Sequence, residues 1–209
     1  MTLRLNGSTS GYTEIDAPAV AGSNTLVLPT GNGSADQALV TNGSGTLSFA
    51  DRGRMVLETA KTATSTAVDF TSIPSWVKRI TVMFNGVSTS GASYLRIQIG
   101  SGSIDATGYA STNGTIGSAS VGGGTGASTG WEMINGGATS TSSGSATILL
   151  IGSNTWVFNS CTSLITSSNT NIAAGHKTAL SGTLDRVRIT TVNGTDTFDA
   201  GSINILYEG

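Results

Sequence analysis

The chain has 209 residues and a formal net charge of −2, and 11% of its residues are charged, against about 25% in ordinary globular proteins. It carries no basic stripe of the kind that nucleic acid requires, so we expect no nucleic-acid partner. Its 29 glycines follow no G-X-Y period, which excludes collagen, and its single cysteine, Cys161, excludes a disulfide framework. We interpret Cys161 as a small buried residue on a strand.

Residues 2–6, TLRLN, lack the apolar segment of a secretory signal. No run approaches the ~18 apolar residues of a membrane span, so we expect no membrane insertion. We therefore expect the product to be made in a cytoplasm and exported, if at all, by other means.

Residues 1–50 contain short strand-like segments at 2–5, 25–28 and 38–40, separated by turns rich in asparagine and glycine. So few apolar residues cannot form a core, and fixing each residue costs ~1–2 kcal/mol in backbone entropy. We expect this part to be disordered as a monomer and to be ordered by other copies of itself or by a larger particle. It forms the predicted anchor or stalk segment, 1–50.

Residues 51–209 read as a second, all-β domain, because no stretch shows helical spacing over ten residues. Short strands at this spacing predict a two-sheet, jelly-roll-like β-sandwich of eight to ten strands. The predicted strands lie at 54–59, 66–70, 77–85, 94–99, 131–134, 146–151, 155–159, 162–166, 186–192, 195–199 and 202–208.

The clearest signal lies at 77–85 and 94–99, where apolar and polar residues alternate. The pattern puts Ile80, Val82 and Phe84 on one face of the first strand, and Leu95, Ile97 and Ile99 on one face of the second. Asn85-Gly86 predicts a turn, and the loop after it is too long for a tight hairpin. The two strands therefore either pair directly or belong to facing sheets.

Residues 100–130 form the longest predicted loop. Long loops inside compact domains are usually functional, so we assign the candidate receptor contacts to Tyr109, Asp105 and Asn113 in this stretch. The alternative is that part of it forms one or two weak strands, with Tyr109 and Trp131 as core residues.

Two further predictions concern the C-terminal half. Residues 146–151 are almost wholly apolar, as in a strand covered on both faces, and this segment is our choice for the most buried strand. Asn193-Gly194, between the predicted strands 186–192 and 195–199, is the firmest hairpin prediction.

No catalytic motif is evident. A paired-carboxylate mechanism needs two acids close together, and Asp196 with Asp199 is the nearest pair, for which solvation on a turn is the better interpretation. His176 lacks a serine or cysteine nucleophile, and residues 122–124 lack the strand and the lysine of a phosphate loop. We therefore expect no enzyme, no cofactor and no metal site.

Three segments in the N-terminal part resemble, in this order, a linker motif of tailed-phage fibre and virion proteins: 11–18 (GYTEIDAP), 22–29 (GSNTLVLP) and 37–49 (QALVTNGSGTLSF). Residues 184–205 are similar to the closing hairpin of a domain recurrent in phage tail fibres, and residues 73–80 to its opening. The resemblance implies a homotrimeric virion appendage with a C-terminal β-domain. Residues 100–130 depart from the pattern, which is where specificity is expected to vary.

Two functional hypotheses remain. In the first, the C-terminal domain binds a bacterial surface glycan or protein, and the N-terminal segment docks onto other virion proteins through Leu3, Leu5 and Tyr12. In the second, the protein is a head fibre, capsid decoration or tail adaptor with no receptor, which the short chain favours. Both place the protein in the virion.

Overall fold

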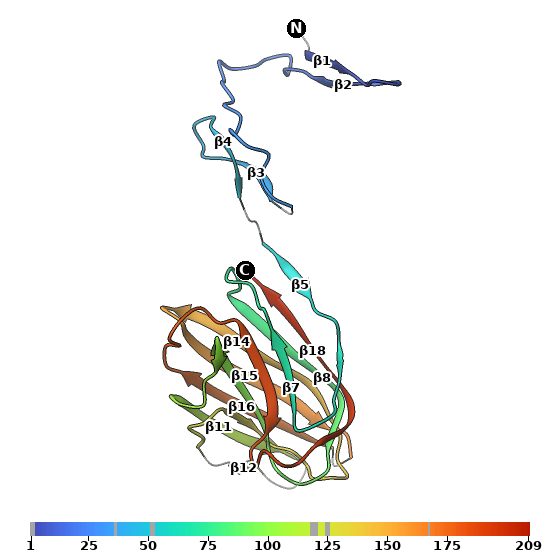
Figure 1. Cartoon of the computed structure of the whole chain (residues 1–209), viewed down its shortest axis with the longest axis vertical. Helices are drawn as coiled ribbons and strands as arrows, with labels where there is room; N and C mark the ends of the chain where they lie inside the picture. The colour runs from blue at the N-terminus through green and yellow to red at the C-terminus, as the bar shows by residue number, and fades with distance from the viewer. Residues whose placement is uncertain (1–2, 36, 51–52, 118–120, 124–125, 167) are drawn as a thin grey trace. The chain divides into compact units, whose positions relative to one another are not determined.

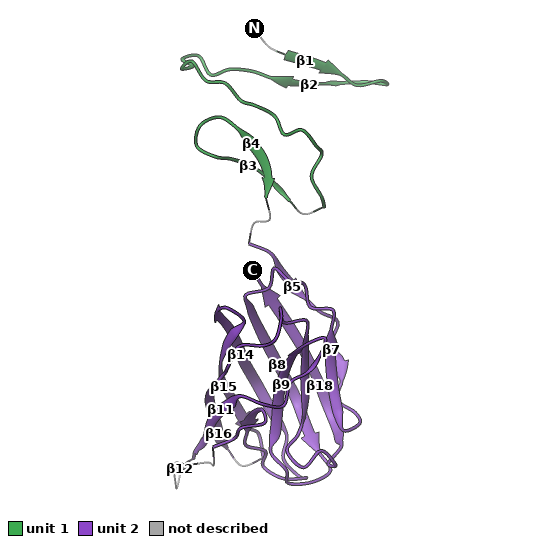
Figure 2. Cartoon of the chain, turned by 60° about the vertical axis from the view of Figure 1, so that its left-hand side comes forward, with its two compact units in different colours: residues 1–52 green, residues 53–209 purple. Residues whose placement is uncertain are grey.

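A computed structural model of the chain describes residues 3–35, 37–50, 53–117, 121–123, 126–166 and 168–209. These residues form strands, turns and loops without a helix, so the predicted all-β class is confirmed, and none of them belongs to a helix able to cross a membrane. The chain divides into two compact units, Met1–Arg52 (unit 1) and Gly53–Gly209 (unit 2), shown in separate colours in Figure 2.

Unit 1 holds two small antiparallel hairpins. The first joins β1 (Leu3–Asn6) to β2 (Tyr12–Ile15), and the second joins β3 (Ala38–Thr41) to β4 (Leu47–Ala50). A parallel bridge between Val27 and Thr46 adds a third segment to the second hairpin. Large apolar side chains that are at least half exposed occur along the unit: Leu3, Leu5, Tyr12, Ile15, Val20, Leu26, Val27, Leu28 and Leu39.

Unit 2 is built on two sheets. The large sheet has the strand order β12-β11-β16-β15-β14-β8-β18-β5, with β6 also paired to β18 (Figure 1). Its strands are β5 (Met55–Leu57), β6 (Lys61–Thr62), β8 (Arg79–Thr89), β11 (Tyr109–Ile116), β12 (Val121–Gly123), β14 (Ser142–Gly152), β15 (Thr155–Leu164), β16 (Asn169–Lys177) and β18 (Phe198–Glu208).

The small sheet has the order β10-β9-β17-β7, with β13 also paired to β9. Its strands are β7 (Ala67–Thr71), β9 (Leu95–Ser101), β10 (Ser103–Ile104), β13 (Trp131–Met133) and β17 (Arg186–Thr191). All the pairings within both sheets are antiparallel.

The inner faces of the two sheets share one hydrophobic core, which gives unit 2 a sandwich-like build. Ile80, Val82 and Phe84 of β8 are buried, as are the apolar residues of β9, so the alternation predicted for both strands is confirmed. The strands lie in facing sheets and do not pair with each other. Between the sheets, the ring of Trp131 stacks on that of Phe158 with centroids 5.0 Å apart. Burial of each such large apolar side chain stabilises the fold by about 1.5–3 kcal/mol.

Asn85-Gly86 does not form a turn. Both residues lie inside β8, where Gly86 has a φ of +61° and the register with β14 and β18 shifts. The backbone N–H of Gly86 donates to the Ser143 hydroxyl at 2.9 Å. The positive φ of Gly86 therefore allows a β-bulge, which bends the strand without ending it.

Asn193-Gly194 forms a turn, but the predicted hairpin is wrong. The flanking strands lie in different sheets, since β17 belongs to the small sheet and β18 to the large one. The segment 195–199 is not a separate strand either, because β18 begins at Phe198 and continues through two register shifts to Glu208. Here the turn carries the chain from one sheet to the other.

The segment 146–151 is not the most buried strand. Within β14, Ala146 and Ile148 are buried, while Leu149 and Ile151 are 39% and 67% exposed. The reason is that the small sheet covers one face of the large sheet, and β14 has only that face in the core.

Candidate functional site

The loops at one end of unit 2 converge into a polar cluster. Unit 2 begins beside the C-terminus, since the backbone N–H of Arg54 donates to the Gly209 carbonyl at 3.0 Å. The loops 89–94, 134–141 and 192–197 lie at the other end of the strands, toward β12 (Figure 1). We call these three segments the far-end loops.

Asp196 connects two of the far-end loops. Its carboxylate accepts the backbone N–H of Ser93 at 3.0 Å and the side-chain amide of Asn193 at 2.8 Å. A Cβ on Gly91 would lie 2.2 Å from Asp196 Oδ2, so any larger residue there would push this carboxylate out of its place. Asp196 is therefore a structural residue of the loop, and solvation alone does not account for it.

Asn193 shapes the same loop from within. Its side-chain oxygen accepts the backbone N–H groups of Thr195 and Asp196, each at 3.1 Å, and the hydroxyl of Thr191 at 3.0 Å. A side chain that bonds the backbone two residues ahead forms an Asx turn. The exposed residues Asn193, Gly194 and Thr195 are thus held in one arrangement, as a binding surface needs to be.

The loop 134–141 is joined to the loop 89–94 by the buried side-chain amide of Asn135. The Asn135 side chain donates to the Thr89 hydroxyl at 2.5 Å and to the Ser93 carbonyl at 3.2 Å. Asn135 is 6% exposed and Thr89 is fully buried, so this link lies beneath the surface. Sequence reasoning missed the cluster, although the run Asn193-Gly194-Thr195-Asp196 carries the Asx-turn signal.

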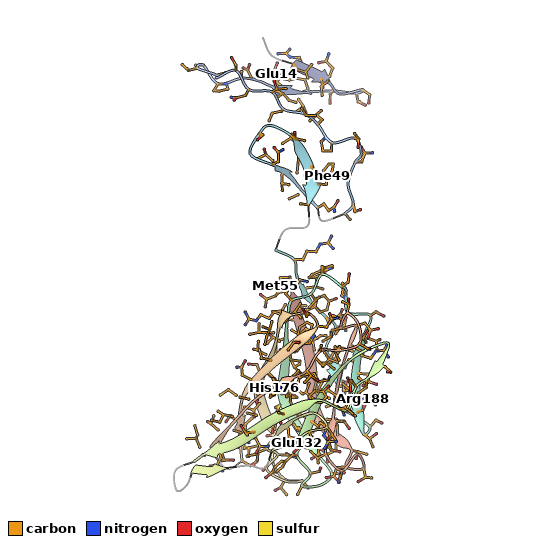
Figure 3. The ribbon with its side chains drawn as sticks, turned by 90° about the vertical axis from the view of Figure 1, so that its left-hand side faces the viewer. Glu14, Phe49, Met55, Glu132, His176 and Arg188 are labelled. Atoms are coloured by element: carbon orange, nitrogen blue, oxygen red, sulfur yellow. The ribbon has the colours of Figure 1, made fainter. Side chains whose placement is uncertain are left out.

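A second surface feature is an open hollow of about 700 Å³ along β11 and β16. His176, which is labelled in Figure 3, is one of its lining residues. Small outward-facing side chains, Ala110, Thr112 and Ala174, form its floor, and the segment 126–128 borders it. A neighbouring hollow of about 390 Å³ continues onto β15 at Asn159. We call the two together the β11–β16 hollow.

Gly175 lies on β16, where the core tryptophan comes close to the backbone. A Cβ there would lie 2.4 Å from the Ala110 carbonyl oxygen and 2.8 Å from the Trp131 ring. Glycine therefore lets the core tryptophan approach the backbone of β16 closely. The hollow exposes hydroxyl, amide and imidazole groups, but its lining contains no carboxylate.

Of the predicted receptor contacts, Tyr109 and Asn113 are buried, at 5% and 6% exposure, on the inner face of β11. The stretch 100–130 is thus no single loop in its described part: β10, β11 and β12 lie in it, and the alternative with Tyr109 and Trp131 in the core is the one observed. The Tyr109 hydroxyl accepts the Ile99 N–H at 2.8 Å, and burial raises the pKa of that hydroxyl.

Asp105 is the most exposed of the three and forms an ion pair with a buried lysine. Its carboxylate lies 3.0 Å from Lys177 Nζ, and the Lys177 side chain is 1% exposed. Lys177 also donates to the Thr178 carbonyl at 3.0 Å and lies 5.4 Å from the centre of the Tyr109 ring. Burial raises the pKa of Asp105, but hydrogen bonds from Thr107 and Lys177 outweigh it and leave that pKa below its usual value.

The predicted docking residues fall on opposite faces of the β1–β2 hairpin. Leu3 lies opposite Ile15, and Leu5 lies opposite Thr13, so these residues share one face. Tyr12 lies opposite Asn6 on the other face, where the Arg4 guanidinium covers its ring at 4.1 Å and also pairs with Glu14. The apolar face therefore includes Ile15, which sequence reasoning missed, and excludes Tyr12.

The residues considered for catalysis are scattered over unit 2. His176 lies on strand β16 and not on a loop, and Asp199 accepts a hydrogen bond from the Ser88 hydroxyl. Cys161 lies on β15, as predicted, but it is exposed and not buried, because it faces outward from the large sheet. Within the described ranges, no three His, Cys, Asp or Glu side chains gather into a group that could hold a metal ion.

Comparison with known proteins gives no further assignment: no protein-family model, no curated protein and no solved structure matches the chain. The functional argument therefore depends on the geometry of the two units.

Proposed function

We propose that the protein is a homotrimeric fibre or spike of a tailed-phage virion, with unit 1 as its stalk and anchor and unit 2 as a host-binding tip. One observation carries the proposal: unit 1 has strands but no core of its own. None of its described residues is buried, and its large apolar side chains are more than half exposed apart from the partly buried Val40, Leu47 and Phe49. The buried apolar residues described in the chain begin at Ala63.

A unit of this kind gains too little by folding alone. Ordering each residue costs about 1–2 kcal/mol in backbone entropy, and an isolated two-stranded hairpin is marginal in water. Burying a large apolar side chain stabilises the folded state by about 1.5–3 kcal/mol, and in unit 1 this requires another surface to cover the side chain. Sister copies supply that surface at equal stoichiometry, and three copies agree with the linker motif that segments 11–18, 22–29 and 37–49 resemble.

In this proposal the apolar face of the β1–β2 hairpin, formed by Leu3, Leu5 and Ile15, docks onto another virion protein. Unit 2, a jelly-roll-like sandwich, presents its far-end loops to the bacterial surface, because they lie opposite the end where the chain enters the unit. Their exposed amide and hydroxyl groups suit a glycan or a polar protein surface. Three tips joined by one stalk would strengthen weak single contacts by about 10²–10⁴-fold.

The second candidate is a head fibre, capsid decoration or tail adaptor that binds no receptor. It is favoured by the absence of an exposed tryptophan or tyrosine in the far-end loops, apart from the partly buried Tyr94. Aromatic anchors are enriched at binding hot spots, and the described loops offer little of that kind. Binding of the fluorescently labelled protein to host cells separates the two candidates, with Asn193→Ala and Thr195→Ala as variants that reduce binding only in the first.

The decisive measurement is the mass of the purified full chain in solution, by native mass spectrometry or light scattering. We expect three times the 21.0 kDa of one chain. A monomeric mass would overturn the proposal, and protection of the unit 1 amides from hydrogen exchange in that monomer would show that unit 1 folds unaided.

A further inference from the structure

The outer faces of the two sheets in unit 2 differ sharply in charge. On the small sheet, β7, β9, β13 and β17 each contain a charged residue. Their ion pairs lie across neighbouring strands, as in Arg188 with Asp69 at 2.7 Å and Arg96 with Glu132 at 3.0 Å. The side chains of Arg188 and Asp69 are 38% and 39% exposed, whereas those of Arg96 and Glu132 are mostly buried, so solvent reaches the charges of β7 and β17 on this face.

On the large sheet, β11, β14 and β15 contain no charged residue at all. Lys177 of β16 faces the core, and the other charged residues of β8, β16 and β18 are Arg79, Asp199 and Glu208. Arg79 pairs with Glu208 at 3.3 Å, and the Asp199 carboxylate accepts a hydrogen bond from the Ser88 hydroxyl. The imidazole of His176 on β16 also lies on this outer face. Depletion of charge is the signature of the central part of a protein interface.

The same face carries apolar side chains that the described residues of unit 2 leave exposed. Leu149 is 39% exposed and Ile151 is 67% exposed on β14, and Ile172 is 43% exposed on β16. At the other edge lies the β11–β16 hollow, floored by small residues. One face thus holds both protruding apolar side chains and a recess without large side chains.

We propose that the outer face of the large sheet is an interface with a second copy of this chain, with Leu149 and Ile151 of one copy packing toward the β11–β16 hollow of another. Charge favours a sister copy as the occupant, because a surface that packs against another copy of itself must not bring like charges together. Here Arg79 and Glu208 neutralise each other, and the one further charge, Asp199, lies at the far end of β18 and is bonded to Ser88. A strongly charged partner would find no complementary group.

The area is adequate for such a contact. Six neighbouring strands about 4.8 Å apart, each contributing about seven residues, present a face of roughly 650 Å². A standard interface buries about 800 Å² on each partner. The inference rests on the self-association in the proposed function and adds to it a contact surface in unit 2, apart from unit 1.

The chain carries its own probe of this face, because its single cysteine, Cys161, is exposed on β15 within it. The test is the rate at which a maleimide labels Cys161 in the wild-type full chain, followed by mass. We expect native labelling to be about tenfold or more slower than in the same chain in denaturant, and to speed up on dilution. Labelling of the oligomer at the denatured rate would overturn the inference.

Two variants locate the contact. Ala174→Glu puts a charge in the hollow, where it is solvated in a free unit 2 but buried in the proposed interface. We expect it to raise the Cys161 labelling rate about tenfold, since burying an unpaired charge is strongly unfavourable. Thr71→Glu, on the exposed outer face of the small sheet, is the matched control and should change the rate less than about twofold.

The outcomes separate the two proposals. A trimeric mass with an unprotected Cys161 leaves the proposed function standing and refutes this interface. A monomeric mass refutes both. If Ala174→Glu fails to fold by circular dichroism, Thr112→Lys on β11 replaces it, and equal labelling rates in Thr112→Lys and the wild-type chain would contradict the placement of the contact.

Discussion

Unit 1 and unit 2 both contain antiparallel strands, yet they bury apolar side chains very differently. In unit 2, two sheets face each other, so Ile80, Val82 and Ile97 are fully buried. In unit 1, each hairpin has one apolar face and no second layer, so Leu5 and Leu39 remain 56% and 51% exposed. The difference shows that strand pairing alone does not make a core, because a sheet needs a partner for its apolar face.

The largest expected effect is at the centre of the unit 2 core. Val82→Asp places an unpaired carboxylate between the sheets, and we expect it to unfold unit 2, since a buried unpaired charge costs several kcal/mol. Thermal unfolding by circular dichroism is the measurement. Thr81→Asp, on the neighbouring outward position, is the matched control and should shift the melting temperature only slightly. An unaltered melting curve for Val82→Asp would show that the facing of β8 is wrong.

Removing residues 1–50 separates the two units directly. We expect the remaining unit 2 to fold with its cooperative melting transition intact, because its core contains no residue of unit 1. Trimerisation should weaken and attachment to the particle should disappear. Light scattering and circular dichroism on the truncated chain check both points, and loss of folding would refute the division into units.

A smaller effect is expected at the bulge that β8 and β18 share. Gly201 has a φ of +86°, and a Cβ there would lie 2.4 Å from the Gly86 carbonyl oxygen. Gly201→Ala is therefore expected to destabilise unit 2 by about 1–3 kcal/mol, measured by urea denaturation. Gly102→Ala, at a positive φ with nothing near the added Cβ, is the control and should cost less. Equal losses of stability in Gly201→Ala and Gly102→Ala would mean that the positive φ, and not the contact with the Gly86 carbonyl, determines the cost.

The smallest effect concerns Asp105 and Lys177. Asp105→Asn removes the charge beside Lys177 but keeps a side-chain oxygen that can accept its hydrogen bond, and the Asp105 side chain is 30% exposed, so we expect a modest loss of stability. Lys177→Met removes the buried charge itself and should be better tolerated. The pKa of Asp105 is lowered in the folded state, so its contribution is present above about pH 4 and is lost as the pH falls through the folded pKa. The difference in stability between the wild-type chain and Asp105→Asn should therefore shrink below that pH.

Much of the fold class could be predicted from local pattern. Alternation along residues 77–85 and 94–99 identified both strands and their buried faces, because a period of two is a property of the strand itself. The candidate site could not be found in this way. Asp196 and Asn193 are near in sequence, but their partners Ser93 and Gly91 are about a hundred residues away, and only the crossing from β17 to β18 brings them together.

By itself the sequence determined that the chain is all-β and which residues of β8 and β9 point inward, since periodicity is a local property of the strand. Tertiary structure decided the rest. Which sheet a strand joins depends on its pairing with strands far away in the sequence. Because of that pairing, Asn85-Gly86 forms a bulge within β8 where a turn was predicted, and Asn193-Gly194 connects two sheets where a hairpin was predicted. Tertiary structure also left Leu149 and Cys161 outside the core, because the small sheet covers only one face of the large sheet.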